Sequence, residues 1–301
     1  MRDVSAHLSA CARLAKVNRM KFARFFVLLL IVFLAACGAT AVSTPIPDAV
    51  SPIQITRMNA DTAVGTPRLV FGLFDGPNPV ADAQSVALSV VPAGETNAAP
   101  VWQGPAENFS DYEVPYWVAY PHLPSAGFWG ITAEVVLADG RTVTSQFAVE
   151  AKAESSAVDV GDLAPLSQNR TLATEPDINK LSSGNNPDPA FYQLTVADAV
   201  ASGKPTVVGF ITPGLCETRW CAPVLNSVAT VRDAVGDAAN FIHIEVYEDF
   251  QALTYVPEMA EWGLVTEPYV FVLDEAGRIT ASLAGPVSPR ELSQALDEVL
   301  P

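Results

Sequence analysis

Cysteine, histidine and basic residues are all scarce in this chain of 301 residues, which has four cysteines and three histidines. So few cysteines exclude a small scaffold that is held together by several disulfides. Lys and Arg number 17 against 33 Asp and Glu, which gives a formal net charge of −16. This excess of acid argues against nucleic acid as a partner and against docking onto anionic lipid.

The chain also lacks an apolar run near its N-terminus that is long enough to cross a membrane. Residues 25–36 are apolar and follow Lys21 and Arg24, but a membrane-spanning helix needs roughly 20 apolar residues. The run ends in Leu-Ala-Ala followed by Cys37, which resembles the lipobox of bacterial lipoproteins. The resemblance implies that residues 1–37 comprise a signal peptide and lipobox, with lipid attached to Cys37. Met20 is the better candidate for the start of translation.

Lipidation at Cys37 would place the folded part on the extracytoplasmic side of a bacterial membrane, in the cell envelope. Residues 38–51 are small and proline-containing, and we expect them to form a flexible tether. Six of the 17 basic residues and one of the 33 acidic residues precede Cys37, which leaves 11 bases, 32 acids and a net charge of −21.

In the rest of the chain, the spacing of apolar and turn residues changes near residue 150. Between 52 and 150 short apolar runs recur with turn residues between them, which predicts an all-β sandwich. Its expected strands cover 53–56, 68–74, 85–91, 116–120, 128–137 and 142–149. The run from 127 to 149 resembles the last strands of bacterial immunoglobulin-like modules. Residues 151–189 read as a linker and a segment leading into the next domain.

From residue 190 to residue 301 helical and strand patterns alternate, which predicts an α/β fold. We expect helices over 195–202, 222–235, 257–262 and 289–300, and strands over 206–211, 241–247, 269–273 and 279–283. The chain is therefore predicted to have two domains, an all-β sandwich followed by an α/β domain.

Cys216 and Cys221 are the most informative residues of the chain. They lie between the predicted strand 206–211 and the helix that follows it. The N-terminus of a helix carries a positive partial charge, which stabilises a thiolate relative to a thiol. Two thiols at such a turn predict a redox site or a soft-metal site, and a purely structural disulfide is the alternative.

The order of elements and the position of this pair resemble the thioredoxin fold from about residue 160 to the C-terminus. Glu267-Pro268 precedes the penultimate strand, where that family has a cis-proline beside its dithiol, so we expect Pro268 to be cis and part of the site. The resemblance implies a thiol–disulfide oxidoreductase without a cofactor, whose partners are exported thiol- or disulfide-containing proteins.

The C-x4-C spacing departs from the usual C-x-x-C. Residues five apart in an unbroken helix have Cα atoms about 8.6 Å apart, beyond the ~7 Å that a disulfide tolerates. Cys216 must therefore lie in the preceding turn, or the first helical turn must open on oxidation. Distance from the strand favours Cys216 as the attacking thiol, whereas the Trp220-Cys221 sequence favours Cys221. Arg219 would stabilise either thiolate.

Other functions remain open on the sequence. The run before Cys216 resembles Q-type peroxiredoxins, but Pro268 stands where those peroxidases have an arginine. Copper-delivery proteins with a thioredoxin fold use two cysteines and a distal histidine, which here would be Cys216, Cys221 and His243, with copper as the cofactor. The thiols could also be vestigial in a docking module whose work is done by the β domain.

Overall fold

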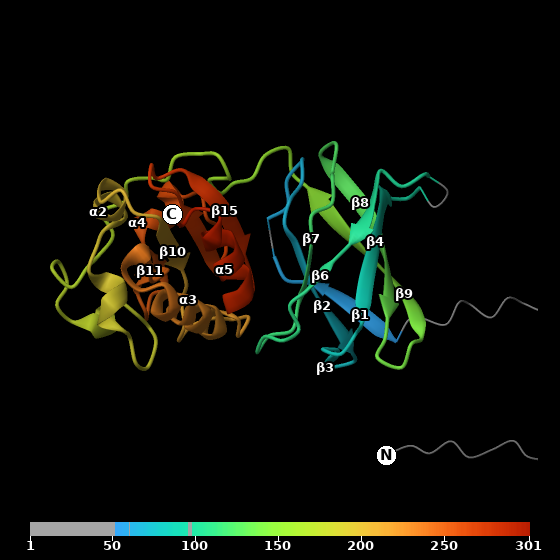
Figure 1. Ribbon diagram of the computed structural model, residues 1–301, viewed down its shortest axis with the longest axis horizontal. Coiled ribbons are helices and arrows are strands. Elements are labelled where there is room, and N and C mark those ends of the chain that lie inside the picture. Colours follow the sequence, from blue (N-terminus) through green and yellow to red (C-terminus); the bar gives the residue numbers. More distant parts are fainter. Residues whose placement is uncertain (1–51, 60, 96–97) are drawn as a thin grey trace, which may run out of the picture. The chain divides into compact units, whose positions relative to one another are not determined.

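The computed structural model describes residues 52–59, 61–95 and 98–301, all of which belong to one compact unit, Ser51–Pro301. The expected signal peptide and lipobox over residues 1–37, with Cys37, and the expected tether over residues 38–51 lie outside these described residues. In the described ranges, strands β1 to β9 precede a region of mixed strands and helices (Figure 1). Within the same ranges, every helix is too short or too polar to span a bilayer.

The first part of the described chain consists of two antiparallel sheets. One has the order β1-β2-β7-β6, with β3 paired to β2, and the other has the order β5-β4-β8-β9. The strands are β1 (Ile53–Arg57), β2 (Leu69–Asp75), β3 (Asn78–Pro79), β4 (Ser85–Pro92), β5 (Trp102–Pro105), β6 (Glu107–Asn108), β7 (Trp117–Ala119), β8 (Gly127–Val136) and β9 (Thr142–Ala151). The predicted strands are present, whereas the short strands β3, β5 and β6 were not predicted.

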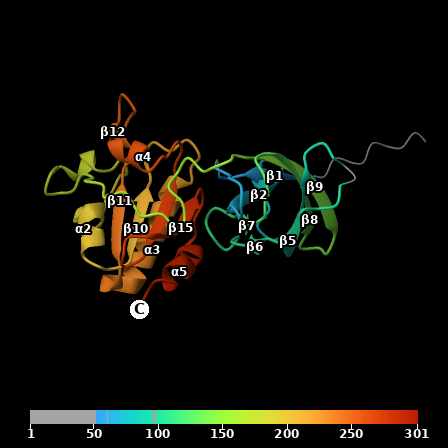
Figure 2. The same ribbon diagram turned by 90° about the horizontal axis from the view of Figure 1, so that it is seen from above.

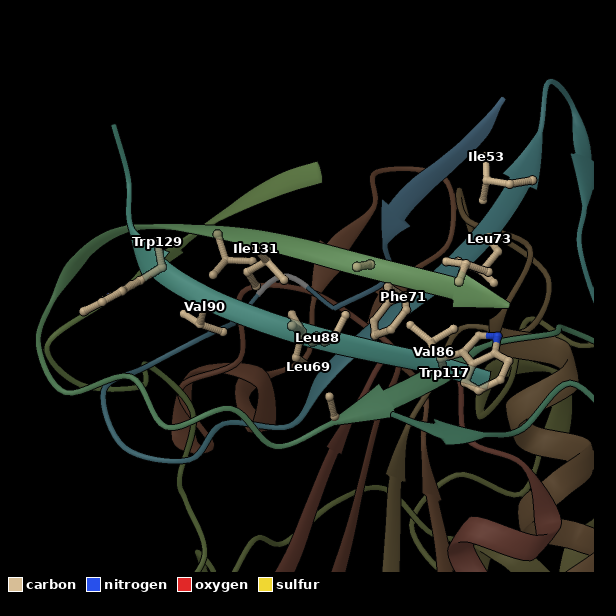
Figure 3. Close-up of a cluster of buried hydrophobic side chains, with 14 of the residues drawn as sticks. Ile53, Leu69, Phe71, Leu73, Val86, Leu88, Val90, Trp117, Trp129 and Ile131 are labelled. Carbon is tan, nitrogen blue, oxygen red and sulfur yellow. The ribbon is translucent and has the colours of Figure 1, made fainter. Parts of the chain in front are cut away.

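The two sheets share one hydrophobic core. Alternate residues of β4 and β8 are buried, as expected where one face of each strand packs inward. Side chains of β2, β4 and β8 point into the same space in Figure 3, among them Phe71, Leu88 and Ile131. Both sheets thus bury one face against each other, as the alternating pattern predicts. The assignment to the immunoglobulin-like class, and the division of the chain into two domains, stay predictions.

The second part is built on a four-stranded mixed sheet in the order β11-β10-β14-β15. Its central strand β10 runs parallel to β11 and antiparallel to β14, and β14 forms a hairpin with β15. The elements are α2 (Val196–Ala201), β10 (Thr206–Phe210), α3 (Cys221–Val235), β11 (Asn240–Ile244), β12 (Tyr247–Asp249), β13 (Thr254–Tyr255), α4 (Pro257–Glu261), β14 (Tyr269–Leu273), β15 (Ile279–Ala284) and α5 (Pro289–Asp297). Three short 3-10 helices cover Ile178–Lys180, Pro189–Tyr192 and Gly236–Ala238.

Helices cover both faces of this sheet. Val208 and Phe210 of β10 belong to one core cluster together with residues of α2 and α4. Val207, which precedes Val208 and faces the other side of the sheet, belongs to a second cluster with residues of α3 and α5. Every residue of β10 and β14 is buried, which explains why both strands are continuous apolar runs in the sequence. This order of strands with helices on both faces is a thioredoxin-like arrangement.

The ends of several helices follow from local side-chain chemistry. Thr195 and Asp198 form a capping box at the start of α2, and Ser288 caps α5 ahead of Pro289. Both starts agree with the predictions. The last helix ends at Asp297 rather than Leu300, and β11 ends at Ile244 rather than Tyr247. The chain turns at Glu245, whose buried carboxylate accepts hydrogen bonds from the backbone N–H and the hydroxyl of Ser183.

Candidate redox site

Three segments meet at one edge of the mixed sheet. Phe210, the last residue of β10, pairs with Ile244 at the end of the parallel strand β11 and with Tyr269 at the start of the antiparallel strand β14. The segments that follow β10 and β11 and the one that precedes β14 therefore leave the sheet at the same edge. The cysteine turn, Glu245 and Glu267-Pro268 lie on these segments.

Cys216 and Cys221 form a disulfide, with a sulfur–sulfur distance of 2.06 Å and Cα atoms 6.0 Å apart. Cys221 is the first residue of α3 and is fully buried, whereas Cys216 lies in the preceding turn and is partly exposed. This placement satisfies the distance limit that the C-x4-C spacing imposes, without opening the helix. Cys216 is the more exposed of the two residues, and its role as the attacking thiol stays a prediction.

The turn that carries Cys216 is held against the segment around Ser183. The backbone N–H of Gly214 donates to the Ser183 hydroxyl at 3.0 Å. A Cβ atom at Gly214 would lie 2.0 Å from the carbonyl oxygen of Ser183, so only glycine allows this close approach. Ser183 is fixed in turn by Glu245. The cysteine turn is thus attached to the sheet edge through two neighbouring segments.

Glu267 is a site residue that the sequence reasoning did not single out. Its Oε2 atom lies 3.2 Å from Cys221 Sγ and accepts a hydrogen bond from the backbone N–H of Thr212 at 2.9 Å. Burial raises the pKa of Glu267 to about 7, the Thr212 bond opposes this, and the negative charges of Glu245 and Glu217 add to it. The only signal in the sequence was an acidic residue directly before the proline.

Pro268 is buried and its peptide bond with Glu267 is cis, as predicted. Arg219 and Trp220, the two residues before Cys221 that we expect to modulate its reactivity, have different surroundings. Arg219 is exposed and has a left-handed φ of 64°. Trp220 is partly buried and packs against a hydrophobic cluster of the first part of the chain, formed by Met58, Val70, Phe109, Tyr116 and Val118.

His243 is not brought to the cysteines. It is buried in β11, where Nε2 donates to the carbonyl oxygen of Ile211 at 2.7 Å and Nδ1 lies 2.6 Å from the Tyr192 hydroxyl. A carbonyl oxygen only accepts, so Nε2 carries the proton and Nδ1 accepts from Tyr192. Burial lowers the pKa of His243. With both nitrogens occupied, His243 has no atom free for the copper set with Cys216 and Cys221.

One group of potential metal-binding atoms occurs in the described ranges, and it contains Glu267 in place of His243. Single atoms of Cys216, Cys221 and Glu267 lie within 4.8 Å of one another. The two sulfurs are bonded to each other here, so this state presents one carboxylate and no thiolate to a cation. We assign no metal site to it.

No protein-family model and no curated protein matches the chain. Among solved structures, neighbours include the thioredoxin domain of thiol-disulfide oxidoreductase BVU-2223 from Bacteroides vulgatus, which is 14% identical and covers 48% of this chain and 100% of that one, with a TM-score of 0.34. StoA from Bacillus subtilis is 21% identical, and the match covers 31% of this chain and 82% of StoA, with a TM-score of 0.26. CopC from Methylosinus trichosporium OB3b is 12% identical, and the match covers 31% of this chain and 83% of CopC, with a TM-score of 0.23.

Proposed function

We propose that this protein is an extracytoplasmic, membrane-anchored thiol–disulfide oxidoreductase that uses Cys216 and Cys221 without a cofactor. The observation that carries the proposal is the disulfide itself, with its buried sulfur at the first residue of α3 and its accessible sulfur in the turn before it. An accessible sulfur paired with a shielded one suits a reaction in which the first exchanges with a partner and the second closes the ring.

In the reducing direction, the Cys216 thiolate attacks one sulfur of a client disulfide. The client bond breaks, its other sulfur leaves as a thiolate and takes a proton from water, and a mixed disulfide remains. The Cys221 sulfur then attacks Cys216 Sγ and releases the second client thiolate, so that two electrons have passed from the dithiol to the client. A dithiol or small-thiol reductant restores the starting state, and the reverse sequence oxidises a client dithiol.

Glu267 is positioned to take the proton that Cys221 must lose in the second step. Its carboxylate lies 3.2 Å from the sulfur and has a pKa of about 7, and a pKa near the working pH suits proton transfer. Disulfide exchange is favoured over peroxide cleavage because Pro268 stands where Q-type peroxiredoxins have an arginine, so this position supplies no positive charge for the negative charge that develops when the O–O bond breaks.

The first test uses the full-length lipidated protein in detergent and follows insulin reduction by dithiothreitol. We expect the wild type to accelerate the reaction, and Cys216→Ser and Cys221→Ser to lose the acceleration. In cells, Cys221→Ser should accumulate mixed disulfides with client proteins, and Cys216→Ser should not. Activity in the double Cys216→Ser/Cys221→Ser variant equal to wild type would refute the function, and mixed disulfides in Cys216→Ser alone would reverse the two roles.

The anchor needs a separate test because Cys37 lies outside the described residues. Metabolic labelling with a palmitate analogue should mark the wild-type protein, and Cys37→Ala should abolish the label and release the protein from the membrane fraction. Labelling that persists in Cys37→Ala would contradict lipidation at this cysteine. The matched variant is Ser43→Ala in the expected tether, which should keep both the label and the membrane location.

A further inference from the structure

The hairpin β12–β13 and the cysteine turn both follow strands that end at the same edge of the mixed sheet. β10 and β11 are parallel and end at the same sheet edge, where Phe210 pairs with Ile244. Cys216 follows six residues after Phe210, and Tyr247, the first residue of β12, follows three residues after Ile244. Figure 2 shows β12 beyond the end of β11. The hairpin thus extends the sheet edge from which the disulfide also projects.

The hairpin exposes aromatic and apolar side chains. Tyr247 and Tyr255 are cross-strand partners whose rings stack at 5.3 Å and 14°. Tyr255 is 56% exposed and Leu253 is 50% exposed, and on the cysteine turn Leu215 is 37% exposed. Clustered exposed apolar residues of this kind are typical of binding surfaces. In the described part of the chain, β12 and β13 pair only with each other, so an extended segment can add to this small sheet.

The charges around this surface are mainly negative. Glu217 adjoins Cys216, and Glu248 and Asp249 lie on β12; all three are exposed. Partial burial of Tyr247 raises its pKa most, followed by the neighbouring Tyr255 and then by the negative charges of Glu267 and Glu217. A residue of the hairpin therefore feels the charge of Glu217 in the cysteine turn.

Two arginines oppose this negative charge. Arg219 is exposed in the cysteine turn, and Arg170 donates to the backbone carbonyl of Tyr247 at 3.5 Å. Three exposed carboxylates, at positions 217, 248 and 249, stand against the one exposed arginine. The balance therefore favours a cationic partner, and the faces of exposed tyrosine rings also attract Lys and Arg side chains.

We propose that the β12–β13 hairpin and the carboxylates beside it form the client-docking surface, and that the segment it takes is an extended polypeptide carrying Lys or Arg next to the reacting cysteine. This inference rests on the proposed function and adds the chemistry of its substrate. The stacked tyrosines receive the basic side chains, the free hairpin edge receives the client backbone, and the client sulfur then reaches Cys216.

The test measures thiol–disulfide exchange between the reduced full-length protein and peptides that carry one cysteine as a mixed disulfide with 2-mercaptoethanol. Three peptides differ only in whether the cysteine is flanked by Lys, Gln or Glu. Each rate is divided by the rate with hydroxyethyl disulfide, a small neutral substrate, so that a change in folding or thiol reactivity cancels. We expect the Lys peptide to react on the order of tenfold faster than the Glu peptide at low salt, and the ratio to fall towards one at high salt.

The Glu217→Gln/Glu248→Gln/Asp249→Asn variant should reduce the Lys-to-Glu ratio severalfold, and Tyr255→Ala should raise the KM for the Lys peptide. A matched control, Glu134→Gln/Glu150→Gln/Glu154→Gln, removes as many charges from exposed positions on and after β8 and β9 and should keep the wild-type ratio. Equal rates for the three peptides, with exchange of hydroxyethyl disulfide intact, would overturn the docking surface and leave the proposed function standing. No exchange with any disulfide would overturn both.

Discussion

Arg68, just before β2, and Glu291 of α5 form a two-pronged ion pair at 2.7 Å, with side chains that are only 7% and 6% exposed. Arg68 also donates to the carbonyl oxygens of Ala284 and Pro286. The Tyr116 hydroxyl donates to Glu291 and accepts from the backbone N–H of Ser288. This buried network joins the β-sheet part of the chain to the N-terminus of α5.

We predict that Glu291→Ala lowers the free energy of unfolding by about 3–5 kcal/mol, because it leaves the Arg68 charge buried without its partner. Arg68→Met/Glu291→Met, which removes both charges and keeps the volume, should cost much less than the two single changes together. Urea unfolding monitored by Trp fluorescence measures both. Asp139→Asn removes the exposed partner of Arg141 and should leave the unfolding midpoint unchanged. Strict additivity in the double variant would show that the pair is not coupled.

Glu267 should make stability fall as the pH rises. Its pKa lies near 7 in the folded protein against an ordinary 4.5, so the folded state holds a proton that the unfolded state has already lost. The stability it contributes is complete below pH 4.5 and is lost as the pH rises through 7. Between those values the oxidised wild type should lose roughly 2–3 kcal/mol relative to Glu267→Gln. Urea unfolding of both proteins across this pH range decides it, and parallel pH profiles would contradict it.

His243 should act in the opposite sense over part of the same range. Burial lowers the pKa of His243, so at mildly acidic pH this residue binds a proton in the unfolded state and stays neutral in the folded state. The associated stability is present above the unfolded pKa near 6.5 and declines as the pH falls below it. His243→Gln should flatten the acid side of the pH–stability profile while lowering stability at neutral pH, because it disturbs two buried hydrogen bonds. Urea unfolding of both proteins at a series of pH values measures this, and parallel profiles would contradict it.

Gly214→Ala should disturb the cysteine turn. The new Cβ would clash with the Ser183 carbonyl oxygen at 2.0 Å, which forces the turn away from its anchor. We expect a loss of about 1–3 kcal/mol and slower exchange at Cys216, measured with hydroxyethyl disulfide. Gly130→Ala, where the nearest side-chain atom is 3.5 Å away, is the matched control and should leave the exchange rate unchanged. Wild-type exchange in Gly214→Ala would show that Ser183 does not hold the turn.

The sequence predicted the mixed sheet well because its central strands are buried on both faces. The runs of β10 and β14 are almost wholly apolar, with Thr206 as the polar residue that begins β10, and Thr195 and Ser288 mark helix starts through their own side chains. The cysteine pair and Pro268 were found because their local motifs are read along the chain. The strands β12 and β13, which contain three and two residues, are too short to leave a periodic signal.

By itself, the sequence determined that two cysteines precede a helix, that their spacing forbids both from lying in it, and that a proline opens the facing strand. These are relations between neighbours along the chain, governed by fixed backbone geometry. Only the tertiary structure decided that Glu267 contacts Cys221, that His243 does not join the cysteines, and that Tyr247 stacks on Tyr255. Those relations depend on which strand ends share a sheet edge and on which side chains the packing buries, and no local pattern encodes either.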